Sequence, residues 1–163
     1  MATSRFMTPE PVRNTGFVNA PTRDQIVTAA HAWLGTPYHH QMSLRGVGTD
    51  CLGLVRGIWR ELYGTEPQAM PAYSRDWAEA SGSETLLDTA RLHFAEIDPR
   101  SAASGDVLIF RYRAGFVAKH AGVLTAPRKF LHACEGGPVC EIALTPWWSR
   151  RIAAAFAFPH IQP

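Results

Sequence analysis

The chain has 163 residues, of which 46% are hydrophobic and 18% are charged. This length and balance are typical of one globular domain with one hydrophobic core, and they exclude an intrinsically disordered chain. The formal net charge of +2 is too small to indicate a nucleic-acid-binding protein, and the arginines are dispersed along the sequence rather than clustered.

The N-terminal segment predicts an extended arm, residues 1–20, followed by a single domain over residues 21–163. The arm contains arginine, proline and asparagine but lacks the apolar stretch of a secretory signal, so we expect the protein to be made and folded in the bacterial cytoplasm. The longest apolar run, residues 152–158, is far too short to cross a bilayer. We therefore expect no insertion into a membrane.

The first predicted helix has clear signals at both ends. Thr22 with Gln25 three positions later forms a capping box, and Gly35 with Pro37 predicts the end of the helix. Its predicted apolar face contains Ile26, Val27, Ala30, Trp33 and Leu34. Residues 38–48, which are rich in glycine and histidine, predict a loop after this helix.

Two further helices are predicted before the strands. The second begins at Thr49 or Asp50 and ends at Gly64, with an apolar face made of Leu54, Val55, Ile58, Trp59 and Leu62. The third covers residues 83–97, with Ser81 and Glu84 as a possible capping box. Its predicted inward residues are Leu86, Leu87, Ala90, Phe94 and Ile97.

After Pro99 the pattern changes to strands separated by short turns. The predicted strands cover residues 107–110, 120–124, 130–134, 139–144 and 152–158. Links as short as these cannot make parallel crossovers, so helices followed by such strands predict an α+β fold with an antiparallel sheet.

Cys51 is the candidate nucleophile, because it lies where a turn becomes the second helix. A helix N-terminus beside an imidazolium lowers the pKa of a thiol, and His120 and His132 follow downstream. Nucleophile, base and orienting group in this order indicate a cysteine hydrolase. His39 and His40 are adjacent in a predicted extended loop and would point to opposite sides, so we assign them no chemistry.

The other two cysteines leave several interpretations open. Cys134 and Cys140 flank a turn with Gly136, Gly137 and Pro138, and they could be small half-buried residues, a disulfide or part of a zinc site. Their spacing matches no common zinc pattern.

The adjacent Trp147 and Trp148 are also ambiguous. They could line a sugar-binding groove or cover the core after the last turn.

Five short motifs in order over residues 22–158 resemble the NlpC/P60 family of cysteine peptidases. The motifs are Thr36-Pro37-Tyr38, Asp50-Cys51-Leu52-Gly53-Leu54-Val55, Gly105-Asp106-Val107, His120-Ala121-Gly122-Val123 and Leu131-His132-Ala133. The loop Tyr-His-His-Gln and the helix Gly-Leu-Val-Arg-Gly-Ile-Trp-Arg-Glu are most similar to the cell-wall peptidases of phage tails and gene transfer agents.

This resemblance implies a papain-like α+β fold, with N-terminal helices and the nucleophile at a helix start, packed on a C-terminal antiparallel sheet. It implies that Cys51 attacks an amide carbonyl, that His120 holds the thiolate as an ion pair and then protonates the leaving amine, and that His132 orients the ring of His120. The Cys51 backbone N–H and the Tyr38 hydroxyl would hold the oxyanion, and Asp50 would contribute to substrate binding. No metal and no other cofactor is implied.

The implied substrate is a peptidoglycan stem peptide, cut between D-glutamate and the diamino acid. The family commonly has serine after the nucleophile and uses it with the preceding aspartate to recognise the substrate amine, whereas this chain has Leu52. The implied partners are tail-tip or hub proteins of a phage-like particle that acts on the wall of the recipient cell. A structural tail-tip module with the same fold but no turnover, and a thiol transferase or other amidase, remain alternatives.

Overall fold

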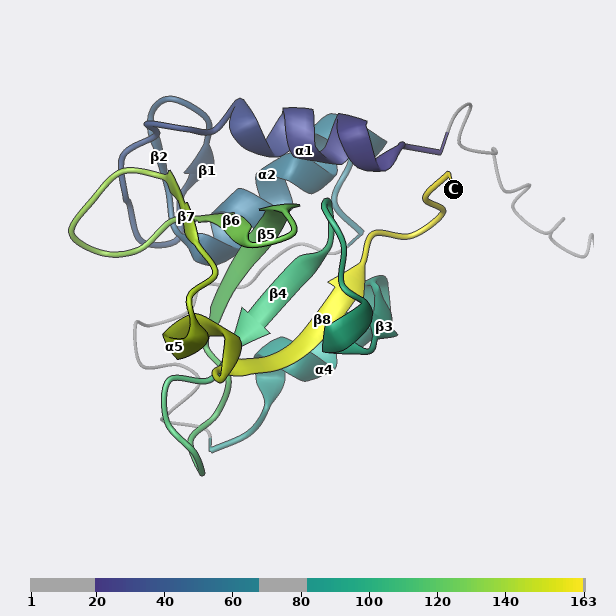
Figure 1. The fold of residues 1–163 in the computed structure, drawn as a ribbon. Helices are drawn as coiled ribbons and strands as arrows, with labels where there is room; N and C mark the ends of the chain where they lie inside the picture. The colour runs from purple at the N-terminus through teal and green to yellow at the C-terminus, as the bar shows by residue number, and fades with distance from the viewer. Residues whose placement is uncertain (1–19, 68–81, 163) are drawn as a thin grey trace, which may run out of the picture.

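The computed structural model describes residues 20–67 and 82–162, which form a helical layer packed on a six-stranded antiparallel sheet (Figure 1). The helices are α1 (Arg23–His31), α2 (Cys51–Tyr63), α4 (Thr85–His93), the 3₁₀ turn η1 (Pro99–Ser101) and α5 (Pro146–Ser149). The sheet strands are β3 (Ala95–Ile97), β4 (Val107–Phe110), β5 (His120–Ala126), β6 (Lys129–His132), β7 (Cys140–Ala143) and β8 (Ile152–Ala157). The predicted α+β fold with an antiparallel sheet is confirmed.

The order of strands in the sheet is β3-β8-β4-β5-β6-β7. The central strands are covered on both faces. Along β4, Val107 and Ile109 belong to the core shared with α1, α2 and α4. The alternate residues Leu108 and Phe110 belong to a second, smaller core on the opposite face, near α5. This alternation is the period of two that a strand requires, with both faces apolar because both are buried.

The capping signals of the first helix are confirmed, although its apolar face is shorter than predicted. Thr22 caps α1 in a complete capping box with Gln25. The helix ends at His31, and a series of turns follows. Trp33 is buried, but Leu34 is 48% exposed, because the turn rotates it away from the sheet.

The predicted third helix is wrong at its C-terminal end. The structure has α4 only to His93, and the next residues form β3, in which Glu96 pairs with Phe156 of β8. Pro99 disfavours helical backbone at the residue before it, and the open edge of β8 offers hydrogen bonds to an extended chain. Glu84 occupies the cap position without a side-chain cap bond, and Ser81, the other half of the predicted box, lies outside the described residues.

Two elements were not predicted. Residues 38–48 were expected as a loop, yet they contain β1 (Ser43–Leu44), which pairs with β2 (Gly48–Thr49) in a small hairpin just before Cys51. The short helix α5 carries Trp147 and Trp148 across one end of the sheet. Neither element is long enough to produce a periodic apolar pattern.

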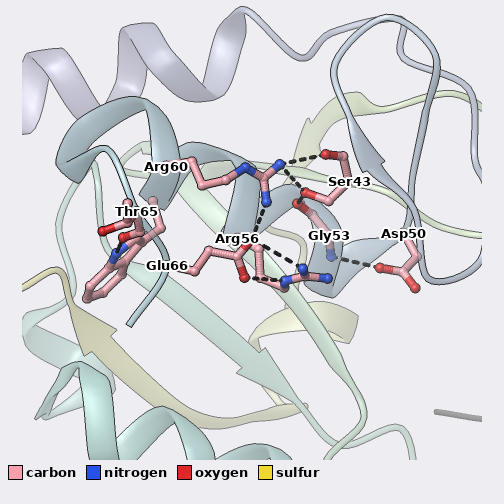
Figure 2. A network of polar contacts seen from close by, with 8 residues as sticks. Ser43, Asp50, Gly53, Arg56, Arg60, Thr65 and Glu66 are labelled. Atoms are coloured by element: carbon pink, nitrogen blue, oxygen red, sulfur yellow. Dashed lines mark hydrogen bonds and ion pairs between the residues drawn. The ribbon is translucent and has the colours of Figure 1, made fainter. Parts of the chain in front are cut away.

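The hairpin holds the start of α2 through a network of polar contacts (Figure 2). The Ser43 hydroxyl donates to the Gly53 carbonyl, and the Arg60 guanidinium donates to the carbonyl and hydroxyl oxygens of Ser43. Arg60 and Arg56 both donate to the Glu66 carboxylate, whose pKa these two arginines hold below its usual range despite partial burial. The hairpin is therefore fixed to the first turn of α2 through Gly53 and to its last turn through Arg60, while Glu66 binds the two arginines of the helix.

None of the helices within residues 20–67 and 82–162 combines the length and the apolar character needed to cross a membrane.

Gly53 is predicted to be sterically required. A Cβ built at this position would lie 2.0 Å from the Met42 carbonyl oxygen and 2.8 Å from Thr49 Oγ1. We expect Gly53→Ala to lower the free energy of unfolding by about 1–3 kcal/mol, the usual cost of overpacking, although alanine gains about 1 kcal/mol in helix propensity. Urea denaturation measures the change.

Gly137 supplies the matched control, because it has no positive φ and a Cβ added there would meet nothing within 4 Å. Gly137→Ala should leave the unfolding free energy within about 0.5 kcal/mol of wild type. A Gly53→Ala protein as stable as Gly137→Ala would contradict the steric argument.

Candidate active site

Cys51 is the first residue of α2, as the sequence predicts for the nucleophile. Because the first amide groups of a helix have no intrahelical acceptors, the N–H groups of Cys51 and Leu52 can face an anion. Helix α2 packs against β5, the strand that begins with His120. The thiol contacts the backbone of Ala121, the residue after His120.

Asp50 caps α2 rather than projecting freely into solvent. Its Oδ1 accepts a hydrogen bond from the Gly53 N–H at 2.7 Å, and its Oδ2 accepts one from the Gln41 N–H at 2.7 Å. The residue is 3% exposed. The predicted role in substrate binding therefore competes with two structural bonds, and it stays a prediction.

His120 and His132 form a buried pair on adjacent strands. The Nε2 atom of His120 lies 2.9 Å from the Nδ1 atom of His132. In the β5–β6 register Val123 pairs with Leu131, so continuing it places His120 and His132 as diagonal neighbours on one face of the sheet. If His120 donates this hydrogen bond, its Nδ1 carries the lone pair that a general base needs.

Aromatic side chains enclose the two histidines. The ring of Tyr112 stacks on His120 with centroids 5.7 Å apart, and Trp148 lies 5.7 Å from His120 and 5.5 Å from His132. The interpretation of Trp148 as a residue that covers the core is supported, since it also packs on Phe110 and Phe130. Tyr112 was missed, because no local pattern links it to a histidine eight positions later.

A cleft of about 230 Å³ opens beside these residues. It is lined by Tyr38, His40, Asp50, Cys51, Leu52, Leu86, Tyr112, Lys119, His120, Ala121, Ala133, Cys134 and Glu135. The structure thus brings Cys51, His120, Tyr38 and Asp50 to one cleft, with His132 behind His120. Tyr38 is held there by a backbone bridge to Thr49, two residues before the nucleophile.

His40 is a cleft residue that the sequence argument dismissed. Its Nδ1 lies 3.6 Å from Asp50 Oδ2, and its side chain is 22% exposed. The sequence argument assumed an extended loop, which this segment is not. Gln41, the next residue, adopts a left-handed conformation with φ of 63°, which turns the backbone around Asp50.

Burial shifts the pKa values of both Cys51 and His120. Enclosure by protein, with a smaller contribution from the Asp50 carboxylate, raises the pKa of the Cys51 thiol to about 12. Burial, and secondarily the neighbouring His132, lowers the pKa of His120 to about 3. Both shifts disfavour the charged forms of the thiol and the imidazole and so oppose the ion pair that the helix N-terminus led us to expect, and that ion pair stays a prediction.

Cys134 and Cys140 are free, half-buried thiols, and Cys134 lines the cleft. Burial, and then proximity to Cys140, raises the pKa of Cys134. In the part of the chain that the structure describes, no group of three histidine, cysteine or acidic side chains is arranged to hold a metal ion. The geometry therefore agrees with the interpretation of small half-buried residues.

Comparison with known proteins gives one family match. The model of the NlpC/P60 family matches residues 35–156. The chain is 25% identical over 134 residues to the murein DD-endopeptidase MepS/murein LD-carboxypeptidase of Escherichia coli K12. That alignment covers 82% of this chain but only 61% of the relative's length.

Solved structures show the same fold. A crystal structure of an NlpC/P60 family protein from Bacillus cereus superposes with a TM-score of 0.63 at 19% identity, covering 86% of this chain and 41% of that one. The NlpC/p60 domain of the peptidoglycan hydrolase SagA superposes with a TM-score of 0.58 at 20% identity, covering 84% of this chain and 99% of that one. The papain-like arrangement is thus shown.

The lowered pKa of His120 predicts a pH dependence of stability. Its folded pKa lies below the unfolded value of 6.5, so the unfolded chain binds a proton that the folded chain does not bind. The stability contributed by neutral His120 is complete above about pH 6.5 and is lost as the pH falls toward 3. Between pH 6.5 and 5 we expect the unfolding free energy to approach a slope of about 1.4 kcal/mol per pH unit for this proton.

The measurement is urea denaturation at several pH values, with His120→Gln and His39→Gln as matched variants. His39→Gln, at an exposed position, should keep the wild-type slope, whereas His120→Gln should be flatter by about one proton. Equal slopes in all three proteins would show that His120 is not held neutral, and a wild-type stability that rises on acidification would indicate a resting ion pair.

Proposed function

The chain belongs to the NlpC/P60 family, and from this membership and the geometry of the cleft we propose that it is a cysteine peptidase that hydrolyses an amide bond in peptidoglycan stem peptides. The observation that carries the proposal is the placement of Cys51 at the start of α2, in the same cleft as a histidine that is hydrogen-bonded at 2.9 Å to a second histidine. Nucleophile, base and orienting group come from three different elements.

In the first half of the proposed reaction, Cys51 Sγ attacks the amide carbonyl carbon while its proton passes to Nδ1 of His120. The imidazolium that forms is stabilised through Nε2 by His132, which acts as the positioning residue. The carbonyl oxygen becomes an oxyanion at the N-terminus of α2, where the Cys51 N–H and the helix dipole oppose its charge. Tyr38 lines the same cleft and is the proposed second donor.

The intermediate then collapses. The carbon–nitrogen bond breaks, the leaving amine takes the proton from His120, and a thioester remains on Cys51. Water, deprotonated by His120, attacks the thioester and releases the carboxylic acid, and the proton returns to the thiolate. Because burial disfavours charge on the thiol and on the imidazole, the fixed dipoles of the helix start act mainly on charge that develops during the reaction.

The finer proposal is cleavage between D-glutamate and the diamino acid. Its support is the motif resemblance, whereas two features of the cleft bear on how the N-terminus of the peptide is recognised. Leu52 provides no hydroxyl beside the nucleophile, and the Asp50 carboxylate already accepts two backbone N–H groups. We therefore propose that a free N-terminal L-alanine amine is not the main recognition element, unlike the usual arrangement in the family.

We also propose that the protein is carried at the tip of a phage-like tail, docked on tail or hub proteins, and acts on the wall of the recipient cell. The support is the similarity of the loop at residues 38–41 and of the α2 sequence to peptidases of such particles.

The peptidase proposal predicts new peptide fragments from purified peptidoglycan sacculi, read by mass spectrometry. Cys51→Ala should reduce their rate of appearance by about 10⁴-fold or more, because the nucleophile is lost. Cys140→Ala, a free thiol outside the cleft lining, is the matched control and should digest at the wild-type rate. Fragments that persist with Cys51→Ala would contradict the assignment, and the masses identify the bond.

Delivery by a tail predicts that the protein co-purifies with phage-like particles released by producing cells. Quantitative mass spectrometry of gradient-purified particles should find it at a fixed ratio to tail proteins and depleted from the capsid fraction after tails are detached. Recovery only as free protein at the top of the gradient would remove the tail proposal and leave the peptidase proposal intact.

A further inference from the structure

Four arginines that are dispersed in the sequence lie together at one end of the sheet. Arg111 and Arg113 follow β4, and Arg150 and Arg151 precede β8. Because β4 and β8 are antiparallel, the end of one lies beside the start of the other, and the Arg111 N–H donates to the Arg151 carbonyl at 2.8 Å. Arginines that are far apart in the sequence are therefore neighbours in the fold.

These arginines line a hollow that leads toward the catalytic cleft. The hollow has a volume of about 450 Å³ and includes Tyr112 in its lining. A second hollow of about 400 Å³ is lined by Tyr112, Arg113, Phe116, Val117 and Lys119. Tyr112 and Lys119 also line the cleft that contains Cys51. A ligand group lying along this surface would therefore continue into the cleft.

The surface has a surplus of positive charge. Arg111 is neutralised, because its guanidinium pairs with Glu84, which also accepts the Ala118 N–H at 3.0 Å. Over residues 20–67 and 82–162, no carboxylate forms a salt bridge with Arg113, Arg150 or Arg151. Arg113 and Arg150 are exposed.

Arg151 is held in place without being neutralised. Its guanidinium lies 3.7 Å from the ring centroid of Trp147. Its Nε donates to the Tyr112 carbonyl at 3.2 Å, and one Nη donates to the Trp147 carbonyl at 2.9 Å. A guanidinium has five N–H groups, so others remain for a ligand. The conformational entropy of ordering this side chain is already lost on folding, which favours binding.

We propose that this arginine surface, defined as Tyr112, Arg113, Arg150 and Arg151, binds carboxylates of the peptidoglycan stem peptide and guides the substrate into the cleft. The inference rests on the proposed function. Guanidinium groups match the planar geometry of carboxylates in paired hydrogen bonds. A stem peptide linked through the γ-carboxyl of glutamate keeps its α-carboxylate free, and its C-terminal residue carries another.

The test compares a stem peptide that ends in a free carboxylate with the same peptide ending in a carboxamide, at low ionic strength where exposed charges are least screened. We expect wild type to prefer the carboxylate by about fivefold in kcat/KM, through KM, in line with weak exposed charge pairs. Arg113→Gln combined with Arg150→Gln should abolish this preference, so that the variant cleaves the two peptides with equal kcat/KM.

Arg128→Gln is the matched control. Arg128 is an exposed arginine in the β5–β6 turn, at the opposite end of β5 from His120, and it should keep the fivefold preference. If wild type cleaves both peptides equally, or if the double variant keeps the preference, the carboxylate subsite is overturned while the peptidase proposal stands.

If neither peptide is cleaved, a binding experiment tests the carboxylate subsite separately from the peptidase proposal. Cys51→Ala protein is sedimented with purified sacculi before and after chemical amidation of their carboxyl groups, with and without the arginine substitutions. The subsite predicts that either amidation or the double substitution lowers the bound fraction severalfold, and that the two together lower it no further. Binding that is insensitive to both changes, or that requires phosphate polymers attached to the wall, overturns the subsite.

Discussion

The attachment of the α2 N-terminus to the preceding loop is the constraint on which the site depends. One carboxylate, that of Asp50, accepts the Gly53 N–H of the helix and the Gln41 N–H of the loop, each at 2.7 Å. Hydrogen bonds to a charged group each contribute about 1.5–3 kcal/mol, and these two also support the left-handed backbone at Gln41. Because Gly53 has no Cβ, the carbonyl of Met42 can lie against the same helical turn. The position of the nucleophile relative to Tyr38 follows from these contacts.

The histidine pair has a different origin, since it depends on strand register rather than on a helix cap. His120 begins β5 and His132 ends β6, so the short turn between these strands brings Nε2 of His120 to 2.9 Å from Nδ1 of His132. A shift of one residue in this pairing would turn one histidine to the other face of the sheet. The buried residues of β5 and β6, which pack into cores on both faces, specify the register and therefore the geometry of the base.

Features that depend on neighbouring residues could be predicted from the sequence, whereas features that depend on residues far away along the chain could not. The Thr22 capping box and the turn before Val107 are local and were predicted correctly, and the start of α2 was placed at Thr49 or Asp50, next to the observed start at Cys51. The end of the third helix was not, because residues 95–97 respond to the open edge of β8, which lies some sixty positions away. His40 was dismissed because no local rule indicates that the loop turns around Asp50. The family motifs supplied the site residues, but only the fold shows that Tyr112 and Trp148 enclose the histidines.

The proposed catalytic residues are enclosed by protein, whereas the arginines at the end of the sheet remain hydrated, and this division has a physical reason. A cation placed beside His120 would have to be desolvated, and it would lower further an imidazole pKa that burial already depresses to about 3. Arginines at the ends of β4 and β8 avoid both effects, since exposed charges keep their hydration and act on a ligand before it enters the cleft. Tyr112 contacts both regions: its ring stacks on His120, while its backbone carbonyl accepts a hydrogen bond from the guanidinium of Arg151. Because the bond to Arg151 comes from the backbone of Tyr112, a side-chain substitution at this position removes the ring beside the base and keeps the carbonyl acceptor, whereas substitutions at Arg113 or Arg150 change only the exposed charges.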